Sequence, residues 1–192
     1  MPSNAASYTA IFLDRDGTLS RNAPLLEMER DCIISALIGQ EFQSSYETRM
    51  EFFWEVWAMP GMSPVATLEG EDRFWQRWYQ CILERYDVGD AETWAADLHQ
   101  KYCYYHMMEL YPESLTVVQA LHGREYRLGV ISDTFPSLEE SIRHLGIAEY
   151  FSSFTASSLV GAGKPDPRIF NAALGALGVT AGESIFVDDT LV

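Results

Sequence analysis

Residues 8–19 read Tyr8-Thr-Ala-Ile-Phe-Leu-Asp14-Arg-Asp16-Gly-Thr-Leu19, a short apolar run that ends in two acidic residues and a glycine. An apolar run of this length, stopped by turn-forming residues, predicts a buried β-strand. Two carboxylates at the end of a buried strand are an uncommon arrangement, because burying like charges together is unfavourable. Such an arrangement requires groups elsewhere in the chain that balance the negative charge.

The C-terminal part of the sequence alternates between strand-like and helix-like segments. Strands are predicted at Arg127–Ser132, near Phe154–Ser157 and at Ser184–Asp188. Helices are predicted from Glu113 to about His122, from Leu138 to a stop at Gly146, and from a capping Asp166 with Pro167 at its first position to Gly178. This alternation predicts an α/β fold with a Rossmann-like, doubly wound parallel sheet, which binds ligands at the carboxyl ends of its strands.

The segment from Pro24 to about Met107 has a different character. Apolar residues recur there at helical spacing, behind a predicted capping box of Ser44 and Glu47 and a capping Asp90. All five tryptophans lie in this segment, and we interpret its aromatic residues as packing rather than as a substrate cage. The sequence therefore predicts a core of residues 1–22 and 108–192 with an inserted helical subdomain at 23–107.

The composition narrows the possible partners and locations. The formal net charge of −15 argues against a nucleic-acid backbone or an anionic membrane surface as a partner. No apolar run reaches the ~20 residues of a membrane helix, and the first residues lack a signal-peptide pattern, so we expect a soluble, cytoplasmic protein.

Cys32, Cys81 and Cys103 lie in helix-like stretches without a CxxC pair, which favours buried, reduced thiols. The four histidines show no spacing typical of metal ligands. No feature of the sequence indicates the oligomeric state of the protein.

Polar residues follow several of the predicted strands. Asp14 and Asp16 end the first strand, Ser132 and Asp133 end the next, and Asp188 and Asp189 end the last. Lys164 precedes a predicted helix. In a parallel sheet these groups meet at one edge, where the carboxylates need a cation to stay ionised. Oxygen ligands of this kind suit Mg²⁺, which usually binds one or two carboxylates, waters and a substrate phosphate.

These residues carry a resemblance to a known family. Asp14-Arg-Asp-Gly-Thr18, Ser132, Lys164-Pro165 and Asp188-Asp189 occur in the order of the four motifs of the haloacid dehalogenase-like superfamily. The spacing of 118 positions from Asp14 to Ser132 resembles that of the branch with a helical cap between the first two motifs. The resemblance implies a magnesium-dependent phosphohydrolase that acts on a small phosphomonoester.

The resemblance also implies a role for each motif residue. Asp14 is expected to be the nucleophile that forms an aspartyl-phosphate, and Asp16 the general acid and then the general base. Ser132 is expected to hydrogen-bond a phosphoryl oxygen and Lys164 to balance negative charge. The expected magnesium ligands are Asp14, the backbone carbonyl of Asp16, and Asp189 directly, with Asp188 acting through water. Asp133 is expected to support the site or a turn.

Three other functions remain open at this stage. A dehalogenase is disfavoured by Asp16, because the family's dehalogenases lack this second acid. A phosphomutase shares every motif and differs in whether water is excluded from the aspartyl-phosphate. A shortened, non-catalytic phosphate-binding protein would keep the fold and the phosphate site.

The sequence departs from the family pattern at two points. Relatives usually continue beyond the fourth motif by about 25–35 residues, the length of a helix and a strand, whereas this sequence ends at Val192. Either the sequence is shortened or the side of the site next to the last strand is built differently. We therefore expect magnesium to bind weakly and the side chains of Ile185 and Val187 to be poorly covered.

The second departure is Arg15, where many capped relatives have an apolar residue. We expect Arg15 either to contact substrate or to be solvated beside the motif.

Overall fold

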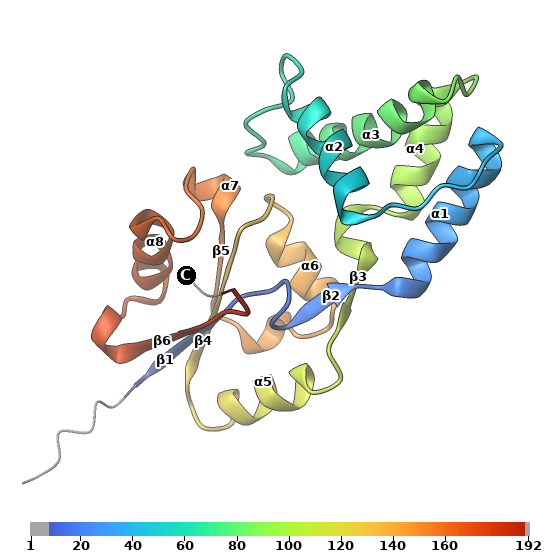
Figure 1. Ribbon diagram of the computed structural model, residues 1–192. Helices are drawn as coiled ribbons and strands as arrows, with labels where there is room; N and C mark the ends of the chain where they lie inside the picture. The colour runs from blue at the N-terminus through green and yellow to red at the C-terminus, as the bar shows by residue number, and fades with distance from the viewer. Residues whose placement is uncertain (1–7, 191–192) are drawn as a thin grey trace, which may run out of the picture. The chain divides into compact units, whose positions relative to one another are not determined.

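The structure is a computed structural model that describes residues 8–190. The chain divides into two compact units, which are both visible in Figure 1. The core unit comprises Met1–Arg21 and Glu109–Val192, and the helical unit comprises Asn22–Met108.

The core unit is built on a four-stranded parallel sheet in the order β5-β4-β1-β6. The strands are β1 (Ala10–Leu13), β4 (Arg127–Ser132), β5 (Ser153–Ala156) and β6 (Ser184–Val187). Leu13 lies opposite Val130 of β4 and Val187 of β6. All of the strands therefore end at the same edge, and the predicted α/β class with a parallel sheet is confirmed.

Helices cover both faces of this sheet (Figure 1). Because side chains alternate along a strand, Ile11 and Leu13 face one side and Ala10 and Phe12 the other. The first face packs against α5 (Ser114–His122) and α6 (Leu138–His144), and the second against α8 (Pro167–Leu177). Short helices complete the core unit: η2 (Ala148–Tyr150), α7 (Ser157–Val160) and η3 (Ala181–Glu183). The sheet is thus doubly wound, as predicted.

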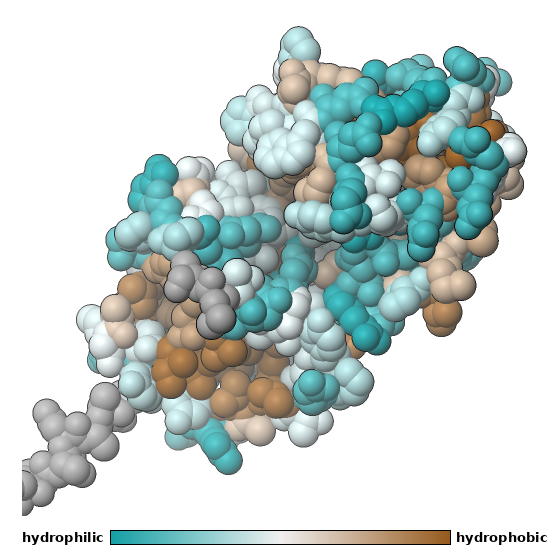
Figure 2. All heavy atoms as spheres, viewed as in Figure 1, coloured by the Kyte–Doolittle hydropathy of each residue, from teal (hydrophilic) through white to brown (hydrophobic). Residues whose placement is uncertain are grey.

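Strand β6 lies at one end of the described sheet and carries apolar side chains that are open to solvent. Ile185 and Val187 are both exposed, in agreement with the sequence expectation. Figure 2 shows hydrophobic side chains at the surface in the region of this strand.

The helical unit forms its own core from four helices and a 3₁₀ turn. They are α1 (Pro24–Ile38), α2 (Tyr46–Trp57), α3 (Leu68–Arg85), α4 (Ala91–Lys101) and η1 (Tyr104–Met107). Aromatic rings of α2 and α3 contact one another, with Phe53 against Phe74 and Phe52 edge-on to Trp78. These rings are packed against each other, as interpreted from the sequence, whereas Tyr46, Trp54 and Trp94 are exposed. Two short strands, β2 (Ser20–Asn22) and β3 (Met108–Leu110), pair where the chain passes between the units.

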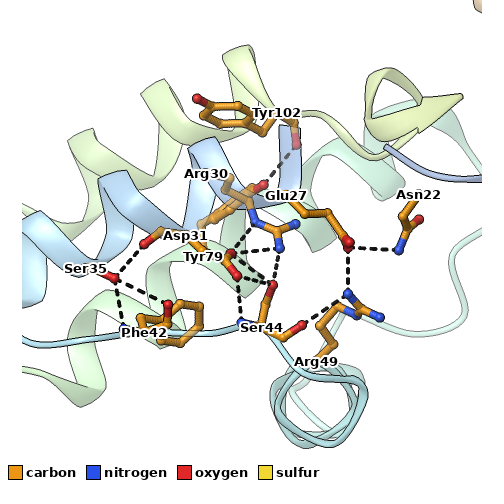
Figure 3. Close-up of polar contacts among 10 residues, drawn as sticks. All are labelled: Asn22, Glu27, Arg30, Asp31, Ser35, Phe42, Ser44, Arg49, Tyr79 and Tyr102. Atoms are coloured by element: carbon orange, nitrogen blue, oxygen red, sulfur yellow. Dashed lines mark hydrogen bonds and ion pairs between the residues drawn. The ribbon is translucent and has the colours of Figure 1, made fainter. Parts of the chain in front are cut away.

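A buried polar network joins α1 to the segment before α2 (Figure 3). The guanidinium of Arg30 donates to the Asp31 carboxylate at 2.9 Å and also contacts the Ser44 hydroxyl. Asp31 in turn accepts the Ser44 backbone N–H at 2.8 Å. The predicted capping box of Ser44 and Glu47 is therefore wrong: the N-cap of α2 is Ser45, whose side chain accepts the Thr48 N–H. Ser44 is buried because it serves this network instead.

Two further local expectations are corrected by the structure. Asp90 occupies the N-cap position of α4, but its side chain makes no capping hydrogen bond and its backbone has a left-handed conformation with φ of 55°. Cys32 is exposed, whereas Cys81 and Cys103 are buried, and Cys103 lies after α4 rather than in a helix. All three thiols are free, and burial raises the pKa of Cys81 and Cys103.

Across residues 8–190, none of the helices has the length and apolar character needed to cross a membrane.

Removing Asp31 tests the importance of the polar network. Asp31→Ala leaves the Arg30 charge buried without this carboxylate, so we expect the free energy of unfolding to fall by about 3 kcal/mol. Asp97→Ala on the exposed side of α4 is the matched control and should change it by less than about 0.5 kcal/mol. Urea unfolding of the whole chain measures both variants. Equal effects would show that the network adds nothing to stability.

Candidate active site

The sheet register places the acidic residues of the first and last motifs side by side. Leu13 pairs with Val187, so Asp14 and Asp188 leave the sheet at the same level on neighbouring strands. The backbone N–H of Asp14 donates to the Val187 carbonyl at 2.9 Å and continues the pairing by one residue. Two carboxylates are thereby held together at the carboxyl edge of the sheet.

Lys164 lies between these two carboxylates. Its Nζ donates to Oδ1 of Asp14 at 2.8 Å and to Oδ2 of Asp188 at 2.7 Å. The three side chains are largely buried, which strengthens their attraction relative to a surface ion pair. The Lys164 backbone N–H donates to Asp133 at 2.9 Å, so Asp133 fixes the loop that carries the lysine. Of the two roles expected for Asp133, support of the site or of a turn, this contact favours the first.

The pKa values of Asp14, Asp188 and Lys164 are all shifted from their ordinary values. Burial raises the pKa of Asp14 to about 6, although the hydrogen bond from Lys164 opposes the shift. Burial also tends to raise the pKa of Asp188, but hydrogen bonds from Lys164 and the Thr190 N–H outweigh it and lower that pKa. Burial tends to lower the pKa of Lys164, and its bonds to the two carboxylates raise it overall. Asp14 is thus the carboxylate whose ionisation is least favoured by its surroundings.

Asp189 completes an acidic cluster beside Asp14. Asp14, Asp188 and Asp189 each offer a carboxylate oxygen, and these three oxygens lie within 4.8 Å of one another. Gly17 has φ of +84°, and a Cβ at this position would lie 2.2 Å from Oδ2 of Asp189. The glycine is therefore required both by its backbone conformation and by the close approach of Asp189. A cluster of hard oxygen donors with one neighbouring ammonium has the chemistry of a Mg²⁺ site.

Ser132 lies at the carboxyl end of β4, on the other side of β1 from Asp188. It is buried, and it is the last residue of its strand, where it pairs with Ala156 of β5. Since Leu13 is level with Val130, Ser132 extends about two residues beyond Leu13. The hydroxyl group is thus carried by the strand that pairs with the strand of Asp14.

Asp16 does not join the acidic cluster through its side chain. Its carboxylate accepts two hydrogen bonds from Arg15, from Nε at 2.9 Å and from Nη2 at 2.8 Å. The Arg15 side chain has an exposed fraction of 0%, so the expectation that it is solvated beside the motif is wrong. The hydroxyls of Thr134 and Ser141 are among its other partners. These two residues were not predicted from the sequence, and their sequence spacing carries no signal for them.

Comparisons with known proteins identify the class to which this fold and site belong. Residues 8–192 match the family described as haloacid dehalogenase-like hydrolase. The chain therefore belongs to the haloacid dehalogenase-like hydrolase family, as the resemblance implied.

The curated relatives in this family include named phosphatases. The chain is 32% identical over 142 residues to a phosphoserine phosphatase of Thermus thermophilus, a match that covers 73% of this chain and 55% of the relative. It is 29% identical over 191 residues to a glyceraldehyde 3-phosphate phosphatase of Pyrococcus abyssi, covering 94% of this chain and 73% of the relative. The chain thus spans about half the length of the first relative and three quarters of the second. The predicted enzyme class, a phosphatase-type hydrolase of this family, agrees with both.

Solved structures with the same fold include both phosphatases and dehalogenases. A phosphatase of this family from Thermococcus onnurineus superposes with a TM-score of 0.58 at 23% identity, covering 95% of this chain and 77% of the other. A 2-haloacid dehalogenase from Pseudomonas syringae superposes with a TM-score of 0.66 at 21% identity, covering 95% and 78%. At these sequence identities the superpositions establish the fold of this chain but not its reaction, which has to be inferred from the residues of the site.

The raised pKa of Asp14 predicts a pH dependence of stability in the metal-free protein. Asp14 has a pKa of about 6 in the fold and about 3.8 in the unfolded chain, so the fold binds the proton more tightly. Its contribution to stability is fully present below pH 3.8 and is lost as the pH rises through about 6. The loss should be on the order of 3 kcal/mol.

The measurement compares the wild-type chain with Asp14→Asn by urea unfolding from pH 4 to pH 7. The stability of the variant relative to wild type should increase across this range, because asparagine does not titrate. The titration of Lys164 lies far above this range and does not contribute. A difference that stays constant with pH would contradict the raised pKa.

Proposed function

We propose that this protein is a magnesium-dependent phosphohydrolase that cleaves a small phosphomonoester through an aspartyl-phosphate on Asp14. The observation that carries the proposal is the contact of Lys164 with Asp14 and Asp188 at the end of adjacent parallel strands. This contact brings together three of the four family motifs, with Ser132 of the remaining motif on the next strand. Named phosphatases among the relatives support the same reaction.

In the first step an oxygen of the Asp14 carboxylate attacks phosphorus. The bond from phosphorus to the ester oxygen breaks, and Asp16 donates a proton to the leaving alcohol. Lys164 lies 2.8 Å from Asp14 and is positioned to offset negative charge on the attacking carboxylate and on the phosphoryl group. The Ser132 hydroxyl donates a hydrogen bond to a phosphoryl oxygen.

In the second step water attacks the phosphorus of the aspartyl-phosphate. Asp16, now ionised, accepts a proton from this water, and the bond from phosphorus to the Asp14 oxygen breaks. Inorganic phosphate is released and Asp14 is again a carboxylate. A second acid is needed because an alkoxide leaves poorly without a proton, whereas a halide does not require one. Asp16 therefore favours phosphate-ester hydrolysis over dehalogenation.

Magnesium fits the cluster formed by Asp14, Asp188 and Asp189. The ligands we propose are Asp14, the backbone carbonyl of Asp16 and Asp189, with Asp188 acting through water. When bound, Mg²⁺ supplies charge neutralisation between the carboxylates and the phosphate. In its absence the Lys164 ammonium contacts both Asp14 and Asp188 and offsets part of their negative charge.

We further propose that the helical unit acts as the cap that selects the substrate. Its boundaries, Asn22–Met108, lie between the first and second motifs. The relatives suggest which substrates to try first, namely phosphoserine and glyceraldehyde 3-phosphate. Both are small phosphomonoesters on three-carbon compounds.

Replacement of Asp14 tests the proposed reaction. We expect wild type to release inorganic phosphate from p-nitrophenyl phosphate only with Mg²⁺, and Asp14→Asn to be inactive because an amide does not attack phosphorus. A melting curve checks that the variant folds. Substantial phosphate release by Asp14→Asn would refute the nucleophile assignment. Transfer of phosphate within the substrate without its release would indicate a phosphomutase.

Replacement of Lys164 tests the charge balance. We expect Lys164→Met to lower kcat/KM by at least about a hundredfold, the scale of one preorganised electrostatic group. The matched control is Lys101→Met, since Lys101 forms an exposed pair with Glu29 in the helical unit. That variant should retain nearly full activity. Similar losses in both variants would mean that Lys164 has no special role in the reaction.

A further inference from the structure

Arg15 is an unusual residue for its place in the fold. It lies between Asp14 and Asp16, and its side chain is completely buried. Burial of a guanidinium is unfavourable unless its N–H groups are hydrogen-bonded and its charge is balanced. A buried side chain also makes no direct contact with a bound substrate in this conformation. The surroundings of Arg15 therefore show what it does.

The guanidinium is anchored to the segment that follows β4. Its Nη1 donates to the Ser141 hydroxyl at 2.9 Å and its Nη2 to the Thr134 hydroxyl at 2.8 Å. The Ser141 hydroxyl itself donates to the Leu138 carbonyl at 2.6 Å, which leaves its oxygen lone pairs for Arg15. Both hydroxyl groups are buried, so they are fixed acceptors rather than solvent-exposed groups.

The same guanidinium holds both oxygens of Asp16. The contacts at 2.9 Å and 2.8 Å form a two-point interaction that restricts rotation of the carboxylate. A tight turn makes this contact between adjacent residues feasible, since the N–H groups of Leu19 and Ser20 both donate to the Arg15 carbonyl. The Asp16 side chain is still 41% exposed, so its oxygens retain lone pairs for a proton.

The two carboxylates of the first motif thus contact different cations. Lys164 contacts Asp14, and Arg15 contacts Asp16. Both cations are supported from the segment that follows β4, Lys164 by Asp133 and Arg15 by the adjacent Thr134, and Arg15 is also held by Ser141 of α6. The Asp16 carboxylate is therefore oriented by Arg15 and not by Lys164, which hydrogen-bonds to Asp14 and Asp188.

We propose that Arg15 is a positioning residue that holds the Asp16 carboxylate in the orientation needed for proton transfer to the leaving oxygen. This role rests on the proposed function. It makes a specific prediction about leaving groups, because a good leaving group departs without a proton and a poor one does not. A structural role for Arg15 would lower the activity on both kinds of ester equally.

The experiment measures kcat/KM for p-nitrophenyl phosphate and for a primary alkyl phosphate. Arg15→Lys keeps the positive charge but loses the two-point contact, so we expect its loss on the alkyl ester to exceed its loss on the nitrophenyl ester by at least about tenfold. Ser141→Ala, which removes one anchor, should shift the ratio in the same direction by less. Arg143→Lys on α6, whose side chain forms an exposed pair with Glu139, is the matched control and should leave the ratio unchanged.

A double variant separates positioning from a general loss of folding. Asp16→Asn should show the same leaving-group signature, and adding Arg15→Lys to it should change the ratio no further. Equal losses on both esters, or a further change in the double variant, would overturn the role of Arg15 while leaving the proposed function intact. A wild-type chain that hydrolyses neither ester would overturn the proposed function and the role of Arg15 with it.

Discussion

The ammonium group of Lys164 holds Asp14 and Asp188 at 2.8 and 2.7 Å, and the arrangement of the site depends on this contact. The parallel register brings the two carboxylates to the same level on adjacent strands, where burial alone would favour their protonation. A fixed cation between them keeps Asp188 ionised, while the pKa of Asp14 remains raised to about 6. The lysine therefore makes an otherwise unfavourable cluster compatible with a folded core.

A second cation has a similar role on the other side of the first motif. Arg15 is buried and contacts Asp16, so the two acids of the motif are held by different groups. This separation suits the two tasks that we propose for these carboxylates, attack on phosphorus by Asp14 and proton transfer by Asp16. The positive charge is supported by hydroxyl groups from the segment after β4 and from α6, which ties the first motif to the second.

The helical unit is stabilised by contacts of its own. Ring contacts between α2 and α3 form its apolar core, and the Arg30–Asp31 pair fixes the segment that precedes α2. The presence of this unit was predictable because its apolar residues recur at helical spacing and all five tryptophans fall within it. Its polar network was not predictable, since the choice of Ser45 over Ser44 as the cap depends on the partner that Asp31 offers.

The sequence by itself determined the four strands of the parallel sheet, the order of the motifs and the polar residues at the strand ends, because these follow from local periodicity and turn chemistry. The strand Arg127–Ser132 and the cap at Asp166 were predicted correctly for this reason. The short strands β2 and β3 were not predicted. Only the tertiary structure decided the strand order β5-β4-β1-β6 and the burial of Arg15. The guanidinium is buried because Thr134 and Ser141, 119 and 126 residues away, meet it in space. Local pattern carries no information about such partners, since a charged residue in a turn is equally compatible with solvent until the chain has folded.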